Sequence, residues 1–131
     1  MPGNPPASSE HLPDIASVLP WRSWEEGNGE ARRRGVPMFV LAEPWWANSS
    51  QRVALRLQQD DELRERVASQ VVPVLVDPDE RPDLVATWRW AAVALTGTAG
   101  PPLMVFLTHE GLPFLAYCTM NIEGDDTYPS L

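Results

Sequence analysis

Residues 95–114 read Leu-Thr-Gly-Thr-Ala-Gly-Pro-Pro-Leu-Met-Val-Phe-Leu-Thr-His-Glu-Gly-Leu-Pro-Phe. The Gly- and Pro-rich segment 96–102 ends any helix that precedes it. The five apolar residues 103–107 then predict a strand, and the turn at 109–111 leads to another strand at 114–118. This stretch therefore predicts an antiparallel hairpin that is entered through a pair of prolines.

Two other apolar runs lie upstream of the hairpin. Residues 36–42, Val-Pro-Met-Phe-Val-Leu-Ala, are almost wholly apolar, which is typical of a strand buried on both faces. Residues 71–76 form a second run. Pro73 removes one backbone donor from this run, so we expect the strand to lie near an edge of the sheet.

Helices are predicted before and between these strands, over 24–34, from 48, from 60 and over 82–95. Ser23 is the expected N-cap of the first helix, and Gly35 is expected to end it. After the first strand, Asn48 or Ser49 is expected to cap the next helix. The first two strands must then be parallel, because a helical crossover joins them.

This order, β-α-β-α-β-β after an extra N-terminal helix, predicts an α/β domain of the thioredoxin-like fold with a mixed four-stranded sheet. We expect the helix that normally follows the last strand to be absent or reduced. The chain divides into a Pro-rich arm over 1–20, the thioredoxin-like domain over 21–120 and a polar tail over 121–131.

Composition excludes several classes of function. The 131 residues suffice for one domain, and a net charge of −8 opposes binding to nucleic acid or to an anionic membrane. No apolar run is long enough to insert into a membrane and no leader is visible, so a cytoplasmic protein is expected. One Cys and two His argue against an internal disulfide, a metal site or another bound cofactor.

Three segments together carry a family resemblance. They are Trp21-x-x-Trp24, the charged stretch Val-Asp-Pro-Asp-Glu-Arg-Pro-Asp-Leu at 76–84, and 95–114. They resemble the thioredoxin-like domain of the spermatogenesis-associated family, which precedes an α/α-barrel in longer members. The chain is then a short form of that family, and the likeness covers roughly residues 20–120.

The resemblance implies where a redox centre would lie. The family carries two Cys in a Cys-x-x-Cys pair after its first strand, and aligning that strand on Phe39 places them at Ala47 and Ser50. Gln51 replaces the His that follows the pair. The family's proline, expected to be cis, corresponds to Pro102, and Pro101 stands where the family has Trp.

The residues at these positions carry no thiol. Dithiol chemistry needs two sulfurs in close proximity, one of them activated at a helix N-terminus. Ala47 has no nucleophile, and Ser50 cannot form a mixed disulfide. Cys118 stands alone and is expected to be a small buried strand residue. No catalytic residue is therefore expected.

Two other kinds of site have weaker support in the sequence. A serine hydrolase would need His11 or His109 beside Ser49 or Ser50, and we expect neither to reach them, so capping is the expected role of these serines. Four carboxylates between 77 and 83 have the chemistry for a hard cation, but their spacing matches no calcium loop. Salt bridging to Arg81 and helix capping are the expected roles of those carboxylates.

Aromatic and proline residues surround the lost dithiol. Trp88 and Trp90 lie two apart on a helix, so one of them should be partly exposed. In thioredoxin-like folds the loop before the dithiol and the loop of the cis-proline form the groove that binds partners. Here that groove is expected to be apolar and chemically inert, formed by Trp45, Trp46, Asn48, Ser49 and Pro101.

The hairpin predicts a second binding surface. A strand that is apolar throughout 103–107 needs cover on both faces, and the tail is too polar to replace the usual terminal helix. If residues 11–20 do not cover this face, another protein chain or a second copy of this one should do so.

The favoured hypothesis is a protein without enzymatic activity that acts through protein contacts as a subunit, scaffold or adaptor. The alternative is a relative of the thiol-disulfide oxidoreductases that uses Cys118 or a partner's thiol. A third hypothesis is a shortened paralogue that binds the longer family's client without chemistry.

Overall fold

The computed structural model describes residues 14–98 and 100–118, without the side chains of residues 117 and 118. The expectations for residues 1–10, for His11, for Ala99 and for the tail over 121–131 lie outside these residues, as does any terminal helix after residue 118. The helices are α1 (Ile15–Val18), α2 (Trp24–Arg34), α3 (Asn48–Gln59), α4 (Asp61–Gln70) and α5 (Pro82–Thr96). The strands are β1 (Met38–Leu41), β2 (Val72–Leu75), β3 (Leu103–Leu107) and β4 (Pro113–Cys118).

The four strands form one mixed sheet in the order β2-β1-β3-β4. β1 runs parallel to β2 and antiparallel to β3, and β3 forms the hairpin with β4. This is the thioredoxin-like α/β fold that the sequence predicts. β2 lies at the edge, as Pro73 indicates, and beyond it the backbone of Arg22 adds a single parallel bridge to Val74.

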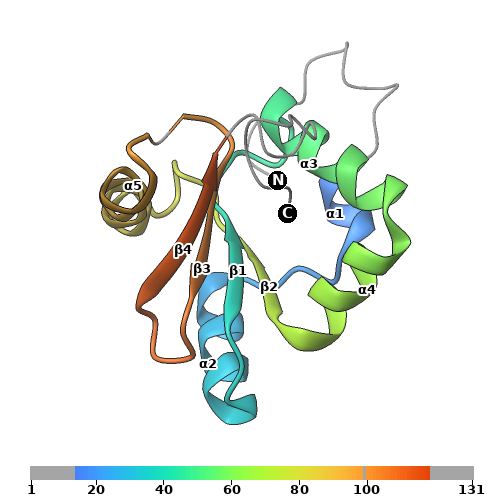
Figure 1. Ribbon diagram of the computed structural model, residues 1–131, viewed down its shortest axis with the longest axis horizontal. Coiled ribbons are helices and arrows are strands. Elements are labelled where there is room, and N and C mark those ends of the chain that lie inside the picture. Colours follow the sequence, from blue (N-terminus) through green and yellow to red (C-terminus); the bar gives the residue numbers. More distant parts are fainter. Residues whose placement is uncertain (1–13, 99, 119–131) are drawn as a thin grey trace.

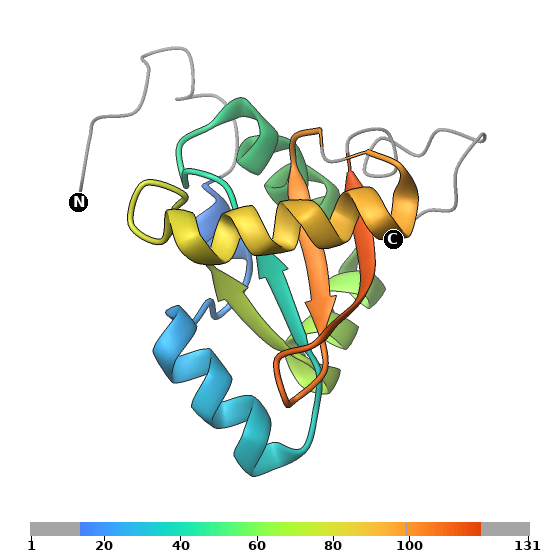
Figure 2. The same cartoon turned by 90° about the vertical axis from the view of Figure 1, so that its left-hand side faces the viewer.

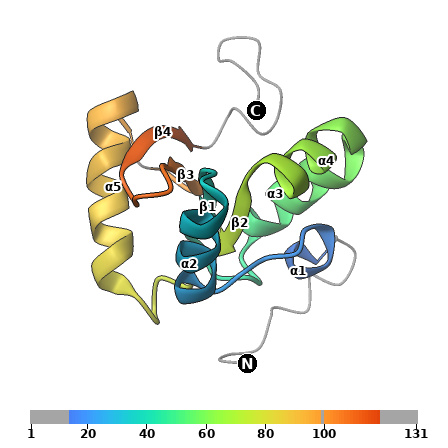
Figure 3. The ribbon, with the colours of Figure 1, turned by 90° about the horizontal axis from the view of Figure 1, so that it is seen from below.

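Helices cover both faces of the sheet (Figure 1). Figure 2 shows α5 running across one face, with α2 beside it on the same side. Seen from below in Figure 3, α3, α4 and α1 lie on the opposite side from α5. The sheet is therefore the middle layer of three, as its almost entirely apolar strands require.

Along each central strand, alternate side chains belong to two separate apolar clusters, one on each face of the sheet. On the α2 and α5 side, Met38 and Val40 of β1 pack with Val105 and with Trp88 of α5. On the other side, Phe39 and Leu41 pack with Met104 and with the middle and last turns of α3. This alternation is the period-two pattern of a strand whose two faces are both covered.

The start and the end of α2 follow directly from the sequence. Ser23 accepts from the backbone N–H of Glu26, whose carboxylate accepts from Ser23 in return, so the two residues form a capping box. Gly35 ends the helix with a φ of 65°, a conformation that glycine adopts without steric cost. Gly27 faces the sheet, where a Cβ would lie 2.4 Å from Cγ2 of Val74. The helix therefore depends on glycine at residue 27 for its close approach to β2.

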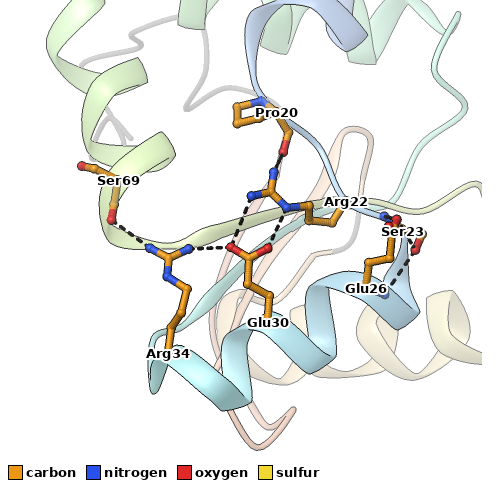
Figure 4. A network of polar contacts seen from close by, with 7 residues as sticks. All are labelled: Pro20, Arg22, Ser23, Glu26, Glu30, Arg34 and Ser69. Carbon is orange, nitrogen blue, oxygen red and sulfur yellow. Dashed lines mark hydrogen bonds and ion pairs between the residues drawn. The ribbon is translucent and has the colours of Figure 1, made fainter.

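A polar network joins α2 to the segment before it and to α4 (Figure 4). Glu30 forms ion pairs with Arg22 and Arg34, each at 2.8 Å. The guanidinium of Arg22 also donates to the carbonyl of Pro20, and that of Arg34 donates to the carbonyl of Ser69. The hydrogen bond from Arg22 is the main reason that the pKa of Glu30 lies below its ordinary value.

The N-terminal segment differs from the expected arm without regular structure. Residues 15–18 form a single helical turn, because Asp14 caps it by accepting from the N–H of Ala16. Ile15 and Leu19 are buried in the cluster on the α3 side of the sheet. Ile15 of α1 and Leu19 directly after it therefore dock on the domain, whereas Leu12 lies outside the described residues.

β3 is covered on both faces, and Ile15 and Leu19 supply part of the cover that the sequence analysis left open to residues 11–20. Leu103, Met104, Val105 and Leu107 are fully buried, because α1 and α3 cover the face that α5 does not. Exposed apolar residues of the hairpin lie instead in the turn and on β4, at Leu112, Phe114 and Leu115. The part of the sheet with exposed apolar side chains is therefore its β4 edge.

Candidate functional site

The predicted dithiol position lies where β1 ends and α3 begins. The N–H of Ala42 donates to the carbonyl of Leu103 at 2.9 Å, so the end of β1 lies beside the start of β3. Ala47 is the N-cap of α3, with extended backbone and no side-chain capping bond, and Asn48 is the first helical residue. The prediction that Asn48 or Ser49 caps this helix is wrong, because the helix begins earlier than either cap would allow.

Both serines at this site use their hydroxyls as donors. Oγ of Ser50 is buried and donates to the carbonyl of Pro44 at 2.7 Å. Oγ of Ser49 donates to Oε1 of Glu43, also at 2.7 Å. Their expected capping role is therefore wrong as well, since each hydroxyl holds the preceding loop and accepts no helix N–H.

Glu43 is a site residue that the sequence analysis did not single out. Its Oε1 accepts from Ser49, and its Oε2 accepts from the backbone N–H of Leu103 at 3.1 Å. The side chain is buried, and its two oxygens join the loop after β1 to α3 and to β3. In the sequence, its position directly after a buried strand is the one signal that indicates a role in joining these segments.

The proline loop meets the same end of the sheet. The peptide bond between Pro101 and Pro102 is cis, the isomer that the resemblance implies for this position. Pro102 is buried, whereas Pro101 is exposed. Because Leu103 follows directly, Glu43 connects this loop to the start of α3.

The lone cysteine lies at this end of the sheet too. In the β3–β4 ladder the backbone of Cys118 pairs with that of Leu103, the residue after the cis peptide bond. Residue 118 therefore lies two strands away from the end of β1, which α3 follows. The spacing of the motifs along the chain gave no indication of this proximity.

The histidine in the hairpin turn cannot serve as a base for the serines. His109 follows β3, whose last residue Leu107 pairs with Met38 at the start of β1. The α3 serines follow the other end of β1, so the length of the sheet separates them from His109. The geometry excludes a Ser–His pair between His109 and either serine.

Five of the tryptophans differ in their surroundings. Trp88 is 3% exposed and Trp90 is 78% exposed, which confirms that one member of this pair faces outward. Trp45 and Trp46 are both partly buried, and Trp45 packs against the apolar cluster on the α3 side. Trp24 packs edge-to-face on Trp88, with ring centroids 5.3 Å apart.

A pocket of about 260 Å³ opens beside the α3 site, at the carboxyl ends of the parallel strands β1 and β2. Trp24, Trp45 and Glu43 are among the residues that line this pocket. Of the five residues predicted to form a groove, only Trp45 is among the described residues that line it. Trp46, Asn48, Ser49 and Pro101 lie outside its described lining.

The charged loop over 77–83 forms ion pairs within the protein. The guanidinium of Arg81 pairs with Glu25 at 2.8 Å and with Asp83 at 3.1 Å. The hydrogen bond from Arg81 holds the pKa of Asp83 below its ordinary value, and the same bond raises the pKa of Arg81. Across residues 14–98 and 100–118, no three His, Cys, Asp or Glu side chains form a group that could hold a metal ion.

None of the helices in residues 14–98 and 100–118 is both long enough and apolar enough to cross a membrane.

Comparisons with known proteins agree with the fold. The sequence model of the family Thioredox_DsbH, described as a protein of unknown function, DUF255, matches residues 7–131. Among solved structures, a disulphide isomerase from Xylella fastidiosa Temecula1 is similar, with a TM-score of 0.59 and 14% identity over 96% of this chain and 88% of that one. A structure titled DsbH Oxidoreductase has a TM-score of 0.49 and 15% identity over 90% of this chain and 81% of that one. No curated protein matches the sequence.

Proposed function

The chain belongs to the Thioredox_DsbH family, and from this premise we propose that it acts through contacts with other protein chains and performs no dithiol chemistry at the start of α3. The observation that carries the proposal is the pair of residues at the expected cysteine positions. Ala47 ends in a methyl group, and the hydroxyl of Ser50 is buried and bonded to Pro44. Neither residue can form a bond to a substrate sulfur.

The site retains the framework of a thioredoxin-like centre. The helix N-terminus lies where it would lower the pKa of a thiol, but no thiol is present for it to activate. The buried carboxylate of Glu43 keeps the two loops next to each other. A framework without its reactive groups suits recognition of a protein surface.

The proposed contact surface is formed by Trp45, Trp46, Asn48, Ser49 and Pro101. In its support, Asn48 and Pro101 are exposed and both tryptophans are partly so. Tryptophans in this position are common anchors at protein interfaces. The partner is another protein chain or a second copy of this one, and the net charge of −8 favours a partner with a basic surface.

A second candidate function is thiol-disulfide exchange through Cys118. The pairing of Cys118 with Leu103 supports it, as does the structural similarity to the Xylella fastidiosa disulphide isomerase. The Cys118 thiolate would attack a substrate disulfide, forming a mixed disulfide and releasing one substrate thiolate. A second thiol, from the substrate or from a small-molecule thiol, would then displace Cys118 and restore its thiolate.

The first candidate function holds a partner by non-covalent contacts, and the second holds it by a disulfide to Cys118. To separate them, the tagged chain and its Cys118→Ser variant are used to capture proteins from the native host, with and without a reductant. We expect the same partner with both chains, and we expect it to stay bound under reducing conditions. A partner that requires Cys118 and is released by the reductant would contradict the proposal and favour thiol exchange.

A further inference from the structure

The pocket at the ends of β1 and β2 has no role in the framework described above. Its floor is apolar, formed by Leu75 and Val76 at the end of β2 and by Ala16 of α1. Two indole rings, those of Trp24 and Trp45, complete the apolar lining. Segments far apart in the sequence meet here, which is typical of a binding site and explains why no motif marked it.

The two indoles differ in their contacts with the rest of the protein. The ring of Trp24 rests edge-to-face on the buried ring of Trp88, so its position is fixed by the core. Nε1 of Trp45 is buried and has no hydrogen-bond partner in the part of the chain that the structure describes. A buried donor without an acceptor is unfavourable, so this indole is held less favourably than that of Trp24.

The polar residues around this apolar floor carry a negative charge. Four carboxylates and one guanidinium are present: Glu25, Glu43, Asp77, Glu80 and Arg81. The guanidinium is already paired with Glu25 and with Asp83 outside the pocket. Glu43 accepts only from the neutral donors Ser49 and Leu103, so its charge has no neutralising partner among the hydrogen bonds that hold it.

A pocket that combines two indole rings with several carboxylates favours one kind of ligand. A metal ion requires several converging ligands, and the described carboxylates form no such group. Faces of Trp attract organic cations, and arginine combines a planar charged head that stacks on aromatic rings with a long apolar stem. A volume of about 260 Å³ is below the usual size of small-molecule pockets, and suits one side chain.

We propose that this pocket binds the side chain of an arginine from a partner protein, between Trp24 and Trp45 and beside the carboxylates of Glu25, Asp77 and Glu80. The inference rests on the proposed function, since it gives the chemistry of one contact that the partner makes. The sequence itself contains no lysine, and the arginine that lines the pocket is already engaged.

The test uses a capped Gly-Arg-Gly peptide and its citrulline counterpart, which has the same shape without the charge. Indole N–H signals are followed by nuclear magnetic resonance and assigned with Trp24→Phe and Trp45→Phe. We expect saturable shifts of the Trp24 and Trp45 signals with the arginine peptide and none with the citrulline peptide at equal concentration. Equal shifts with both peptides, or none with either, would overturn the proposal.

A charge-neutral variant provides the matched comparison. Glu80→Gln removes one carboxylate of the pocket, and Glu65→Gln makes the same change on the exposed surface of α4. We expect the first to weaken peptide binding about two- to fivefold, the range of one exposed ion pair, and the second to leave it unchanged. Equal weakening by both variants would show that the overall negative charge, and not the pocket, attracts the peptide.

Failure of this inference can be told apart from failure of the proposed function. If the arginine peptide does not bind but a partner is still captured by the Cys118→Ser chain, only the pocket assignment fails. If the peptide binds but capture requires Cys118, the pocket assignment stands and the proposed function fails.

Discussion

Oε2 of Glu43 accepts a hydrogen bond from the backbone N–H of Leu103 at 3.1 Å, joining two residues that lie 60 positions apart in the chain. Through the other oxygen the same carboxylate holds Ser49 on α3. One side chain therefore positions the loop after β1 against both the first turn of α3 and the start of β3. The arrangement of the whole candidate site depends on this bridge.

Replacing Glu43 tests the bridge. Glu43→Ala leaves the buried N–H of Leu103 without an acceptor, so we expect it to lower the free energy of unfolding by about 1–3 kcal/mol. Urea unfolding measures the change. Glu65→Ala on the exposed face of α4 is the control and should change stability by no more than about 0.5 kcal/mol. A Glu43→Ala protein as stable as the control would show that the bridge does not support the site.

The two glycines inside α2 should respond in opposite directions to the same substitution. A Cβ at Gly27 would lie 2.4 Å from the buried Val74, so Gly27→Ala should destabilise the protein by about 1–3 kcal/mol. A Cβ at Gly29 would meet only the flexible end of Arg33, so Gly29→Ala should stabilise it by up to about 1 kcal/mol. Thermal unfolding of both variants measures the difference, and equal effects would be inconsistent with the close approach of α2 to β2.

The network around Glu30 predicts a dependence of stability on pH. The pKa of Glu30 in the folded protein lies below its ordinary value of 4.5, chiefly because of the hydrogen bond from Arg22. Its contribution is therefore present above pH 4.5 and is lost as the pH falls through the lowered pKa. Glu30→Gln should cost at most about 1 kcal/mol at neutral pH, and this cost should shrink as the pH falls from 4.5 through the lowered pKa. A cost that does not change with pH would mean that the ion pairs contribute nothing.

Trp88 and Trp90 offer another matched pair on α5. Trp88 is buried against Trp24, so Trp88→Ala should destabilise the protein by about 3–5 kcal/mol. Trp90 is exposed, and Trp90→Ala should change stability by no more than about 0.5 kcal/mol. Urea unfolding separates the two, and a large loss at Trp90 would contradict the orientation of α5.

Much of the fold could be predicted from the sequence, because its signals are local. The apolar runs mark all four strands, and the Ser23 cap and Gly35 bound α2 where the structure has them. The start of α3 could not be predicted in this way. Its N-cap Ala47 makes no side-chain capping bond, and the hydroxyls that looked like caps hold the preceding loop instead.

The candidate site was less predictable, because its key contacts join distant segments. A glutamate after a strand is typical of an exposed loop, and the hydrogen bonds from Ser49 and from the distant N–H of Leu103 explain why Glu43 is buried. The cover of β3 by α1 depends on a four-residue helix between two prolines, which has no helical periodicity to recognise. The pocket between Trp24 and Trp45 likewise exists only after folding.

The central claim is that this protein acts through contacts and performs no thiol-disulfide exchange, neither at the start of α3 nor through Cys118. Insulin reduction with dithiothreitol as the electron donor tests it most directly, comparing the wild-type chain with the Ala47→Cys/Ser50→Cys variant, each with and without Cys118→Ser. We predict the background rate for wild type, and an internal disulfide with measurable reduction for the double variant. Reduction of insulin by the wild-type chain above background, abolished by Cys118→Ser, would contradict the claim.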